Sequence, residues 1–217
     1  MNWKGRRVLI TAGPTREYLD PVRYISNESS GRMGYALARA AKRLGARVVL
    51  VSGPTSLRPP SGIILERVVT AEEMHKKTLK HFSGSAVVIG AAAVGDFKAS
   101  KTAGRKIKKK GGRKWTLSLI PTADILADLG RRKDKNGLPI IVAFALETER
   151  LIENAKEKLK RKRADMIVAN GREALGAVRT RLTIIRPGAQ KVELPPMGKL
   201  KAAGKILKHA GDLYDAC

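Results

Sequence analysis

The sequence is poor in cysteine, in aromatic residues and in long apolar runs, and each shortage excludes a class of protein. Cys217 is the only cysteine among 217 residues, so an internal disulfide framework is excluded. Aromatic residues make up 4% of the chain, which favours a core of Val, Ile, Leu and Ala. No apolar run approaches the roughly 20 residues that span a bilayer, and the first residues lack the apolar stretch of a signal peptide. We therefore expect a cytoplasmic protein without a membrane segment.

Acidic residues are also few: 44 Lys and Arg face 19 Asp and Glu, which gives a formal net charge of +25. The excess is concentrated in two places. Residues 101–115 hold eight basic side chains and no acid, and residues 156–163 hold six basic side chains and one acid. Such a surface attracts anions, from RNA and DNA to phosphorylated metabolites. The charge by itself leaves open a nucleic-acid-binding protein and an enzyme for phosphorylated substrates.

Short apolar segments alternate with segments of helical period, a pattern typical of a mostly parallel sheet covered by helices on both faces. We expect strands at residues 8–11, 47–52, 86–89, 140–145 and 166–169, and helices at 33–44, 70–82, 151–159 and from about 199. Gly45 is expected to end the first helix, and Thr70 with Glu73 predicts a capping box at the start of the second. The predicted fold class is Rossmann-like, doubly wound α/β, in a single domain over residues 1–217.

Two segments break this alternation. Residues 97–117 are basic and contain glycine, and we expect them to form a protruding β-arm with strands at 106–108 and 115–119. Residues 171–217 are expected to form a strand pair, 182–185 with 191–194, and a final helix.

The first connection, residues 12–30, is much longer than the roughly 2–6 residues common between a strand and a helix in such folds, which indicates a functional segment. In open parallel sheets, ligands bind beyond the carboxyl ends of the strands. Ser29, Gly31 and Gly34 follow at a helix start, where backbone N–H groups and the helix dipole favour a phosphate. An ordinary N-cap with a close-packing glycine is equally compatible with this spacing. The glycine patterns of P-loops and of standard dinucleotide sites do not occur.

Several blocks of the sequence resemble one enzyme family. The longest are residues 9–17, 20–27 and 29–34, and shorter ones follow in order at 91–97, 106–109, 124–127, 144–148, Lys158 with Lys162, and 168–170. These blocks resemble the signature of phosphopantothenoylcysteine synthetases, the phosphopantothenate–cysteine ligases that form one domain of the bifunctional coenzyme A biosynthesis protein. The flavin-dependent decarboxylase half of that protein is not part of the sequence, which leaves open a stand-alone ligase and a domain cut from a longer chain.

The resemblance implies a reaction and a set of site residues. A nucleoside triphosphate, with CTP favoured over ATP, activates the carboxylate of 4′-phosphopantothenate, and cysteine then displaces the nucleotide. Mg²⁺ accompanies the nucleotide, and no metal-binding residue is assigned. Catalytic roles fall to Arg23, Asn27 and Lys106, and substrate contacts to Arg23, Asn27, Ala92, Ala93 and Asp96. The nucleotide site is assigned to Gly13, Ser29, Gly31, Gly34, Ala92, Asp96, Lys106, Ala123, Asp124, Ile125, Leu126, Phe144, Lys158, Lys162 and Asn170. The family also implies a homodimer, in which Arg23 reaches the neighbouring subunit's site.

Without the resemblance, these residues have simpler interpretations. Asn27, Asp96 and Asp124 could each be a turn or cap residue instead of a site residue. Lys106, Lys158 and Lys162 could be solvated surface lysines. The chain also departs from the family at Thr122-Ala123, where Asn-Pro is usual, and along residues 171–180. Contacts to the nucleotide base are therefore where the family's pattern is least preserved.

Two other protein classes remain as alternatives. A basic nucleic-acid-binding domain accounts for the net charge of +25, but it leaves Asn27, Asp96 and the long first connection unexplained. An NAD(P)-linked reductase of the same fold class is disfavoured, because the glycine fingerprint and a Tyr-x-x-x-Lys pair are missing.

Overall fold

The computed structural model describes residues 2–109, 111, 114–146, 151–171, 177–188 and 191–217. The strands of the main sheet are β1 (Arg7–Ala12), β4 (Arg47–Ser52), β5 (Ile64–Arg67), β6 (Val87–Gly90), β9 (Ile140–Leu146), β10 (Met166–Asn170), β11 (Arg179–Ile185) and β12 (Val192–Gly198). The helices are α1 (Arg32–Arg43), α2 (Ala71–Phe82), α3 (Ile125–Arg131), α4 (Leu151–Arg161) and α5 (Lys199–Asp215). Separate hairpins are formed by β2 (Arg16–Asp20) with β3 (Arg23–Ser26), and by β7 (Phe97–Ala99) with β8 (Leu119–Pro121).

The main sheet has the strand order β12-β11-β10-β9-β6-β1-β4-β5. Strands β10, β9, β6, β1, β4 and β5 pair in parallel, whereas β11 and β12 run antiparallel at one edge. From β1 the chain builds one side of the sheet through β4 and β5, and then the other side through β6, β9 and β10. Such a reversal opens a ligand crevice at the carboxyl ends of the two central strands. The predicted Rossmann-like, mostly parallel sheet and its terminal strand pair are confirmed.

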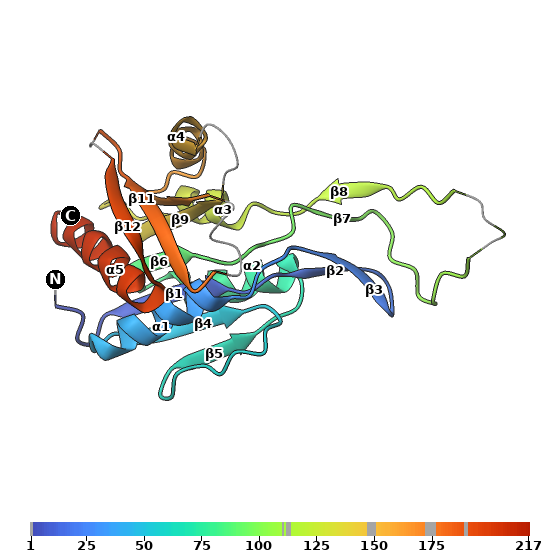
Figure 1. Ribbon diagram of the computed structural model, residues 1–217, viewed down its shortest axis with the longest axis horizontal. Coiled ribbons are helices and arrows are strands. Elements are labelled where there is room, and N and C mark those ends of the chain that lie inside the picture. Colours follow the sequence, from blue (N-terminus) through green and yellow to red (C-terminus); the bar gives the residue numbers. More distant parts are fainter. Residues whose placement is uncertain (1, 110, 112–113, 147–150, 172–176, 189–190) are drawn as a thin grey trace.

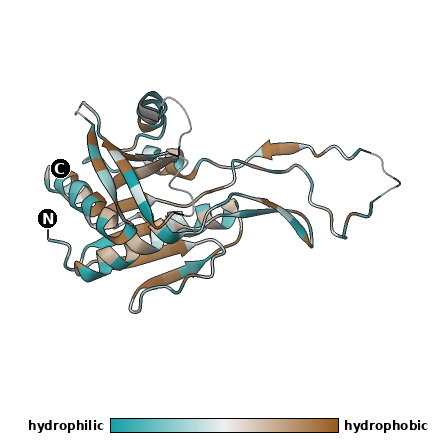
Figure 2. Ribbon diagram, in the orientation of Figure 1, coloured by the Kyte–Doolittle hydropathy of each residue, from teal (hydrophilic) through white to brown (hydrophobic). Residues whose placement is uncertain are grey.

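Helices cover both faces of the sheet because its strands are apolar on both faces (Figures 1 and 2). Successive strand residues point to opposite faces. In β1, Val8 and Ile10 pack in one cluster with α1 and α5, whereas Leu9 packs in a second cluster with α2, α3 and α4. The two chain ends lie at the same end of the molecule, opposite the arm (Figure 1).

Local signals in the sequence form as predicted at two helix ends. Thr70 Oγ1 accepts a hydrogen bond from the Glu73 backbone N–H at 3.2 Å, and the Glu73 carboxylate accepts one from the Thr70 N–H, which completes the capping box of α2. Gly45 follows the last turn of α1 with φ +86°, a left-handed conformation that glycine adopts without strain. Both features are determined within a few residues, so the sequence alone can specify them.

Other elements differ from the prediction. Residues 12–30, expected to be a loop, contain the β2–β3 hairpin, in which Tyr18 pairs with Tyr24. Strand β5 and helix α3 are additional elements, although the interpretation of Asp124 as a cap is confirmed by its place at the start of α3. Strand β5 carries only half-buried and exposed residues, and α3 is seven residues long, so neither shows enough apolar periodicity to be recognised.

The predicted arm is present, but the prediction of its strands is wrong. Phe97–Ala99 pairs with Leu119–Pro121 at its base, whereas residues 106–108 and 115–118 are not strands. Beyond β7 the chain instead runs along the first hairpin, where the Ala103 N–H donates to the Leu19 carbonyl oxygen at 2.9 Å. The arm is therefore two hairpins side by side that project from the sheet (Figure 1). Its outer part is held by contacts distant in sequence, which a strand pattern does not reveal.

Candidate active site

A cavity of about 630 Å³ opens where the central strands end and helices α1, α3 and α5 begin. Its walls include Thr11 at the end of β1, Gly90 at the end of β6, Phe144 in β9 and Asn170 in β10. The predicted site residues that line it are Asn27, Ser29, Gly31, Ala92, Ala93, Asp96, Ala123, Asp124, Ile125, Leu126, Phe144, Lys158, Lys162 and Asn170. These residues come from six separate segments of the chain, and the fold brings them to one end of the sheet.

Two of the predicted glycines lie behind the cavity wall and are required for packing. A Cβ on Gly34 would lie 2.4 Å from the Ala12 Cβ, so only glycine lets α1 lie this close to β1. Gly13 has φ +74°, and a Cβ there would lie 3.1 Å from the Gly53 carbonyl oxygen. Gly13 and Gly34 thus set the position of the helix start, and only Gly31 of the three lines the cavity.

Asn27 ties the segment before α1 to the end of β6. Its Nδ2 donates to the Ala93 carbonyl oxygen at 3.2 Å and to the Val94 carbonyl oxygen at 3.1 Å. A primary amide carries two N–H donors, so both are used on the backbone in this conformation. Donation to a substrate carboxylate would replace one of these bonds.

The alternative interpretation of this segment, an N-cap with a close-packing glycine, applies only in part, because no side chain caps helix α1. Helix α1 begins at Arg32, and its N-cap is Gly31, with φ +72° and no side chain to cap the helix. The Gly31 N–H points back to Ser29 Oγ, at a donor–acceptor distance of 3.4 Å. The close-packing part of that alternative does apply, to Gly34.

The end of β6 forms the floor of the cavity through small residues. The Ala92 N–H donates to Thr11 Oγ1 at 3.3 Å, and the Ala93 N–H to the Gly13 carbonyl oxygen at 2.9 Å. Methyl side chains here leave the space above the sheet open. Asp96 follows as an exposed residue of the cavity lining.

On the opposite wall, Asp124 joins the start of α3 to Lys162, the residue that follows α4. Its Oδ1 accepts the Ala127 N–H at 3.1 Å, as the N-cap of α3, and also pairs with Lys162 Nζ at 3.1 Å. Burial alone would raise the pKa of Asp124, but the Ala127 hydrogen bond and the Lys162 charge hold it below its ordinary value. The Lys162 side chain is only 14% exposed, so it is not a solvated lysine.

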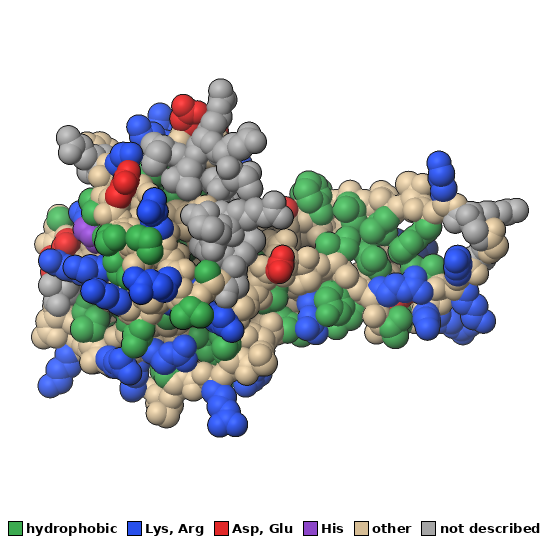
Figure 3. All heavy atoms as spheres, viewed as in Figure 1, with side chains coloured by type: hydrophobic (Ala, Val, Ile, Leu, Met, Phe, Trp, Pro, Cys, Tyr) green, Lys and Arg blue, Asp and Glu red, His purple; other side chains and the backbone are tan. Residues whose placement is uncertain are grey.

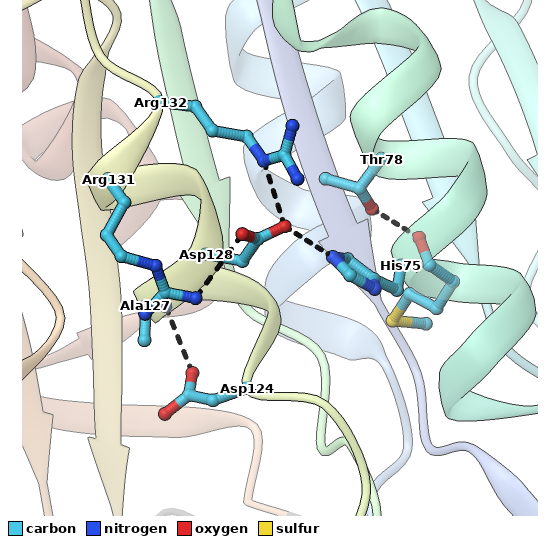
Figure 4. A network of polar contacts seen from close by, with 8 residues as sticks. His75, Thr78, Asp124, Ala127, Asp128, Arg131 and Arg132 are labelled. Carbon is cyan, nitrogen blue, oxygen red and sulfur yellow. Dashed lines mark hydrogen bonds and ion pairs between the residues drawn. The ribbon is translucent and has the colours of Figure 1, made fainter.

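A polar network holds α3 against α2. His75 Nε2 lies 2.9 Å from Asp128 Oδ2, which also accepts from Arg132 Nε at 3.0 Å (Figure 4). The hydrogen bond with His75, together with Arg132, lowers the pKa of Asp128. The network fixes α3 and thereby the wall formed by Asp124, Ile125 and Leu126.

Arg23 and Lys106 lie in the arm and do not line this cavity. Arg23 Nη2 donates to the Ile107 carbonyl oxygen at 2.6 Å, next to Lys106. Asp20 organises the contact, because its carboxylate accepts the backbone N–H groups of Val22, Arg23 and Ile107 at 2.8–3.1 Å. Burial acts to raise the pKa of Asp20, but these three bonds and the Arg23 charge hold it below its ordinary value.

Several polar residues of importance here were not predicted from the sequence, among them Glu28 of the cavity lining. Asp20 is the buried anchor of the arm, and Arg32, Thr180 and Lys199 line the cavity. Burial, and then the like charge of Arg32, lower the pKa of Lys199. The one available signal for Lys199 is its place at the first position of the last predicted helix.

Membrane and metal features are absent from the part of the chain that the structure describes. No helix there is long and apolar enough to cross a bilayer. Nor do the described His, Cys, Asp and Glu residues form a group of three or more that could hold a metal ion.

The chain is similar to domains of known proteins over nearly its whole length. The family model of the DNA/pantothenate metabolism flavoprotein C-terminal domain matches residues 3–213. The coenzyme A biosynthesis bifunctional protein CoaBC of Borreliella burgdorferi is 41% identical over 206 residues, which cover 94% of this chain and 52% of that protein. The protein of the same name from Bacillus subtilis is 44% identical over 215 residues, covering 97% and 52%. The chain thus spans about half the length of these curated relatives.

A solved structure has the same fold. The crystal structure of the C-terminal domain of a coenzyme A biosynthesis bifunctional protein CoaBC superposes with a TM-score of 0.84 at 40% identity. The match covers 99% of this chain and all of that one.

Proposed function

The chain belongs to the family of DNA/pantothenate metabolism flavoprotein C-terminal domains, and on this premise we propose that residues 1–217 act as a phosphopantothenate–cysteine ligase. The phosphopantothenate carboxylate attacks the α-phosphorus of a nucleoside triphosphate, a P–O bond forms, and pyrophosphate leaves. The cysteine amine then attacks the acyl carbon, an amide C–N bond forms, and the nucleoside monophosphate leaves. The amine proton is released to solvent.

The observation that carries this proposal is a single cavity with positive charge on two opposite walls. Arg32 and Lys199 lie at the starts of α1 and α5, whereas Lys158 lies in α4 and Lys162 directly follows it. A ligase of this kind must hold two anionic substrates in contact, and fixing them in one geometry is a large part of such catalysis. Helix N-termini at the cavity add backbone donors for phosphate oxygens.

Asn27 is placed to orient the carboxylate that is activated. With its Nδ2 held by the Ala93 and Val94 carbonyl oxygens, the side chain has a fixed direction above the small floor of Ala92 and Ala93. When the substrate binds, Asn27 can give up one of these hydrogen bonds and donate to the substrate carboxylate instead. The free-energy cost is small, because one N–H···O bond replaces another. A neutral amide also does not compete with the substrate as a nucleophile.

CTP is the proposed nucleotide, with ATP as the alternative, and Mg²⁺ is its proposed partner. Glu28, Asp96 and Asp124 are the carboxylates of the described cavity lining, and Asp124 is already engaged by Lys162. One or two carboxylates suit Mg²⁺, which is commonly bound mainly through substrate phosphates. Glu28 and Asp96 would therefore hold it, and when bound it supplies neutralising charge for the triphosphate.

We further propose a homodimer in which the arm of one subunit completes the cavity of the other. Arg23 and Lys106 lie together on the arm and do not line the cavity of their own subunit. The resemblance nevertheless assigns both residues to the binding of anionic substrates, so a second subunit would have to bring them to a cavity. The arm also exposes large apolar side chains, which gather along it (Figure 3). They are Tyr18, Val22, Tyr24, Phe97, Trp115, Leu119 and Ile120. Exposed apolar groups of this kind mark an interaction surface.

The reaction is tested by pyrophosphate release from the purified chain, with phosphopantothenate, cysteine and Mg²⁺, comparing CTP with ATP. We expect release that depends on phosphopantothenate and on the nucleotide. Omission of cysteine should leave pyrophosphate release limited to about one equivalent per site, because the acyl-nucleotide then accumulates. A folded protein that turns over neither nucleotide would refute the ligase.

The shared site is tested by mixing two inactive variants, Arg23→Ala and Asn27→Ala. After free exchange of an equal mixture, about half of the dimers contain one subunit of each variant. If Arg23 serves the partner's cavity, each mixed dimer has one intact site of two, so the mixture regains about one quarter of the unsubstituted activity. If Arg23 serves its own cavity, no mixed dimer contains an intact site and the mixture stays inactive. Co-purification of one variant through an affinity tag carried only by the other verifies that subunits have exchanged.

A further inference from the structure

Residues 91–96 link β6 to β7 and bring Asp96 to the cavity, but they belong to no strand or helix. The backbone groups of such a link have no regular ladder of partners, so its course depends on individual contacts. Three consecutive peptide groups lie between Val94 and Phe97. Each of them forms a hydrogen bond with a residue from another part of the chain.

Two side chains hold the first of these peptide groups, which joins Val94 to Gly95. Asn27 Nδ2 donates to the Val94 carbonyl oxygen at 3.1 Å, and the Gly95 N–H donates to Thr15 Oγ1 at 2.9 Å. Thr15 is buried, so water does not compete for its hydroxyl. This peptide group is therefore held on both of its sides.

Thr122 holds the next two peptide groups, one on each side of Asp96. Its Oγ1 donates to the Gly95 carbonyl oxygen at 2.6 Å, and its backbone N–H donates to the Asp96 carbonyl oxygen at 2.9 Å. Because a peptide group is planar, holding the groups before and after a residue restrains both of its backbone dihedral angles. Thr122 thereby restrains the direction in which the Asp96 side chain leaves the backbone.

The glycine at position 95 makes the hydroxyl contact important. Glycine has a wide range of backbone conformations, so the peptide group between Gly95 and Asp96 turns easily unless another residue holds it. Among the contacts of the described residues, the Thr122 hydroxyl is the one that holds this group. Without that hydroxyl, the backbone before Asp96 would be restrained only at the preceding peptide group.

Thr122 also joins two parts of the cavity wall. It lines the cavity, extends the β7–β8 pairing one step beyond Phe97 and Pro121, and lies two residues before Asp124. Asp124 is the N-cap of α3. The contacts of Thr122 therefore fix the Asp96 backbone relative to the start of α3. The resemblance assigns Thr122 no role, because the chain departs from the family's pattern there.

We propose that Thr122 is a positioning residue of the site, which holds Asp96 in the direction needed to bind the metal–triphosphate complex. It acts through Asp96 and not on the reacting atoms. The inference rests on the proposed function for the identity of the metal and the nucleotide. Loss of the Thr122 hydroxyl leaves the Asp96 carboxylate to be ordered when the ligand binds, and the entropy of that ordering weakens binding.

Calorimetric titration of the full chain measures this role, with CTP in Mg²⁺ and with CTP in EDTA, or with ATP if pyrophosphate release selects it. Thr122→Val removes the hydroxyl and keeps the backbone N–H, whereas Thr122→Ser keeps both. Thr78→Val is the matched control, because Thr78 Oγ1 also donates to a carbonyl oxygen at 2.6 Å, that of Met74 inside α2.

Thr122→Val should weaken the binding of Mg²⁺–CTP about three- to tenfold, as expected for one lost hydrogen bond. Thr122→Ser should weaken it by less than about twofold, because the hydroxyl remains. Thr78→Val should leave the affinity unchanged. In EDTA, CTP should bind all variants equally, because the contribution of Asp96 depends on the metal.

A double-mutant cycle with Asp96→Asn tests whether Thr122 acts through Asp96. Asp96→Asn should itself weaken Mg²⁺–CTP. Thr122→Val should then weaken it by less than about twofold further, because the carboxylate that Thr122 orients is gone. A residue that only supports the fold would give the same loss in both backgrounds.

The inference would be overturned by undiminished affinity of Thr122→Val, by an equal loss in EDTA, or by additive effects with Asp96→Asn. It would also be overturned if Mg²⁺ did not strengthen nucleotide binding to the unsubstituted chain, or if Asp96→Asn bound Mg²⁺–CTP normally. If the cycle showed coupling but the unsubstituted chain formed no amide product, the positioning role would stand and the ligase would fail. If product formed without any effect of Thr122→Val, the ligase would stand and the positioning role would fail.

Discussion

Gly34→Ala tests how closely α1 must approach β1. The new Cβ would lie 2.4 Å from the Ala12 Cβ and 3.2 Å from the Thr11 carbonyl oxygen. Carbon atoms pack at about 3.5–4.0 Å, so the helix start must withdraw by roughly 1 Å. Overpacking of this kind costs about 1–3 kcal/mol, and the better helix propensity of alanine returns about 1 kcal/mol. We therefore expect a net destabilisation of about 0–2 kcal/mol.

Gly204→Ala is the matched control, because it makes the same chemical change inside α5. A Cβ on Gly204 would meet no atom within 4 Å, so the propensity gain stands alone, at about 1 kcal/mol of added stability. The two variants should differ in stability by the overpacking cost of about 1–3 kcal/mol. At roughly 2–4 °C per kcal/mol for a chain of this size, the melting temperature of Gly34→Ala, measured by circular dichroism, should lie about 2–12 °C below that of Gly204→Ala. Equal melting temperatures would show that the close approach is not a constraint. The withdrawn helix should also bind CTP more weakly, since it carries Ser29 and Gly31 away from the phosphates.

Other expected outcomes concern single side chains. Asn27→Asp places a carboxylate against the Ala93 and Val94 carbonyl oxygens and against the incoming substrate carboxylate, so KM for phosphopantothenate should rise while CTP affinity persists; unchanged kinetics would contradict the site. Lys106→Ala should slow exchange of labelled pyrophosphate into CTP by about 10²–10³-fold if it neutralises the triphosphate in the transition state, and an unchanged exchange rate would exclude that role. Glu66 has its pKa lowered to about 2, first by its hydrogen bond with Lys77 and then by that with His81. Its stabilisation is present above the unfolded pKa and disappears as pH falls toward about 2, so Glu66→Gln should flatten the decline in unfolding free energy between about pH 5 and pH 3. Urea unfolding at these pH values measures it, and parallel curves for both proteins would refute the assignment.

The elements that the sequence predicts share a local cause. Val8, Leu9 and Ile10 form a continuous apolar run because both faces of their strand are covered, and this requires no knowledge of which helix covers them. The capping box of Thr70 and Glu73 closes within four residues. Strand β5 and helix α3 escape prediction because their packing against the sheet, and not their own pattern, makes them stable.

For the site, the sequence alone is enough to recognise the family signature and to place Ala92 and Asp96 beyond the carboxyl end of a strand, since strand ends follow from the apolar pattern. It could not determine which cations share the cavity. Only the tertiary structure brought Lys199 beside Arg32, because α1 and α5 pack on the same face of the sheet and start at the same end. Only the tertiary structure carried Arg23 and Lys106 away on the arm, through the buried carboxylate of Asp20. Such contacts join residues far apart in the chain, and no local periodicity encodes them.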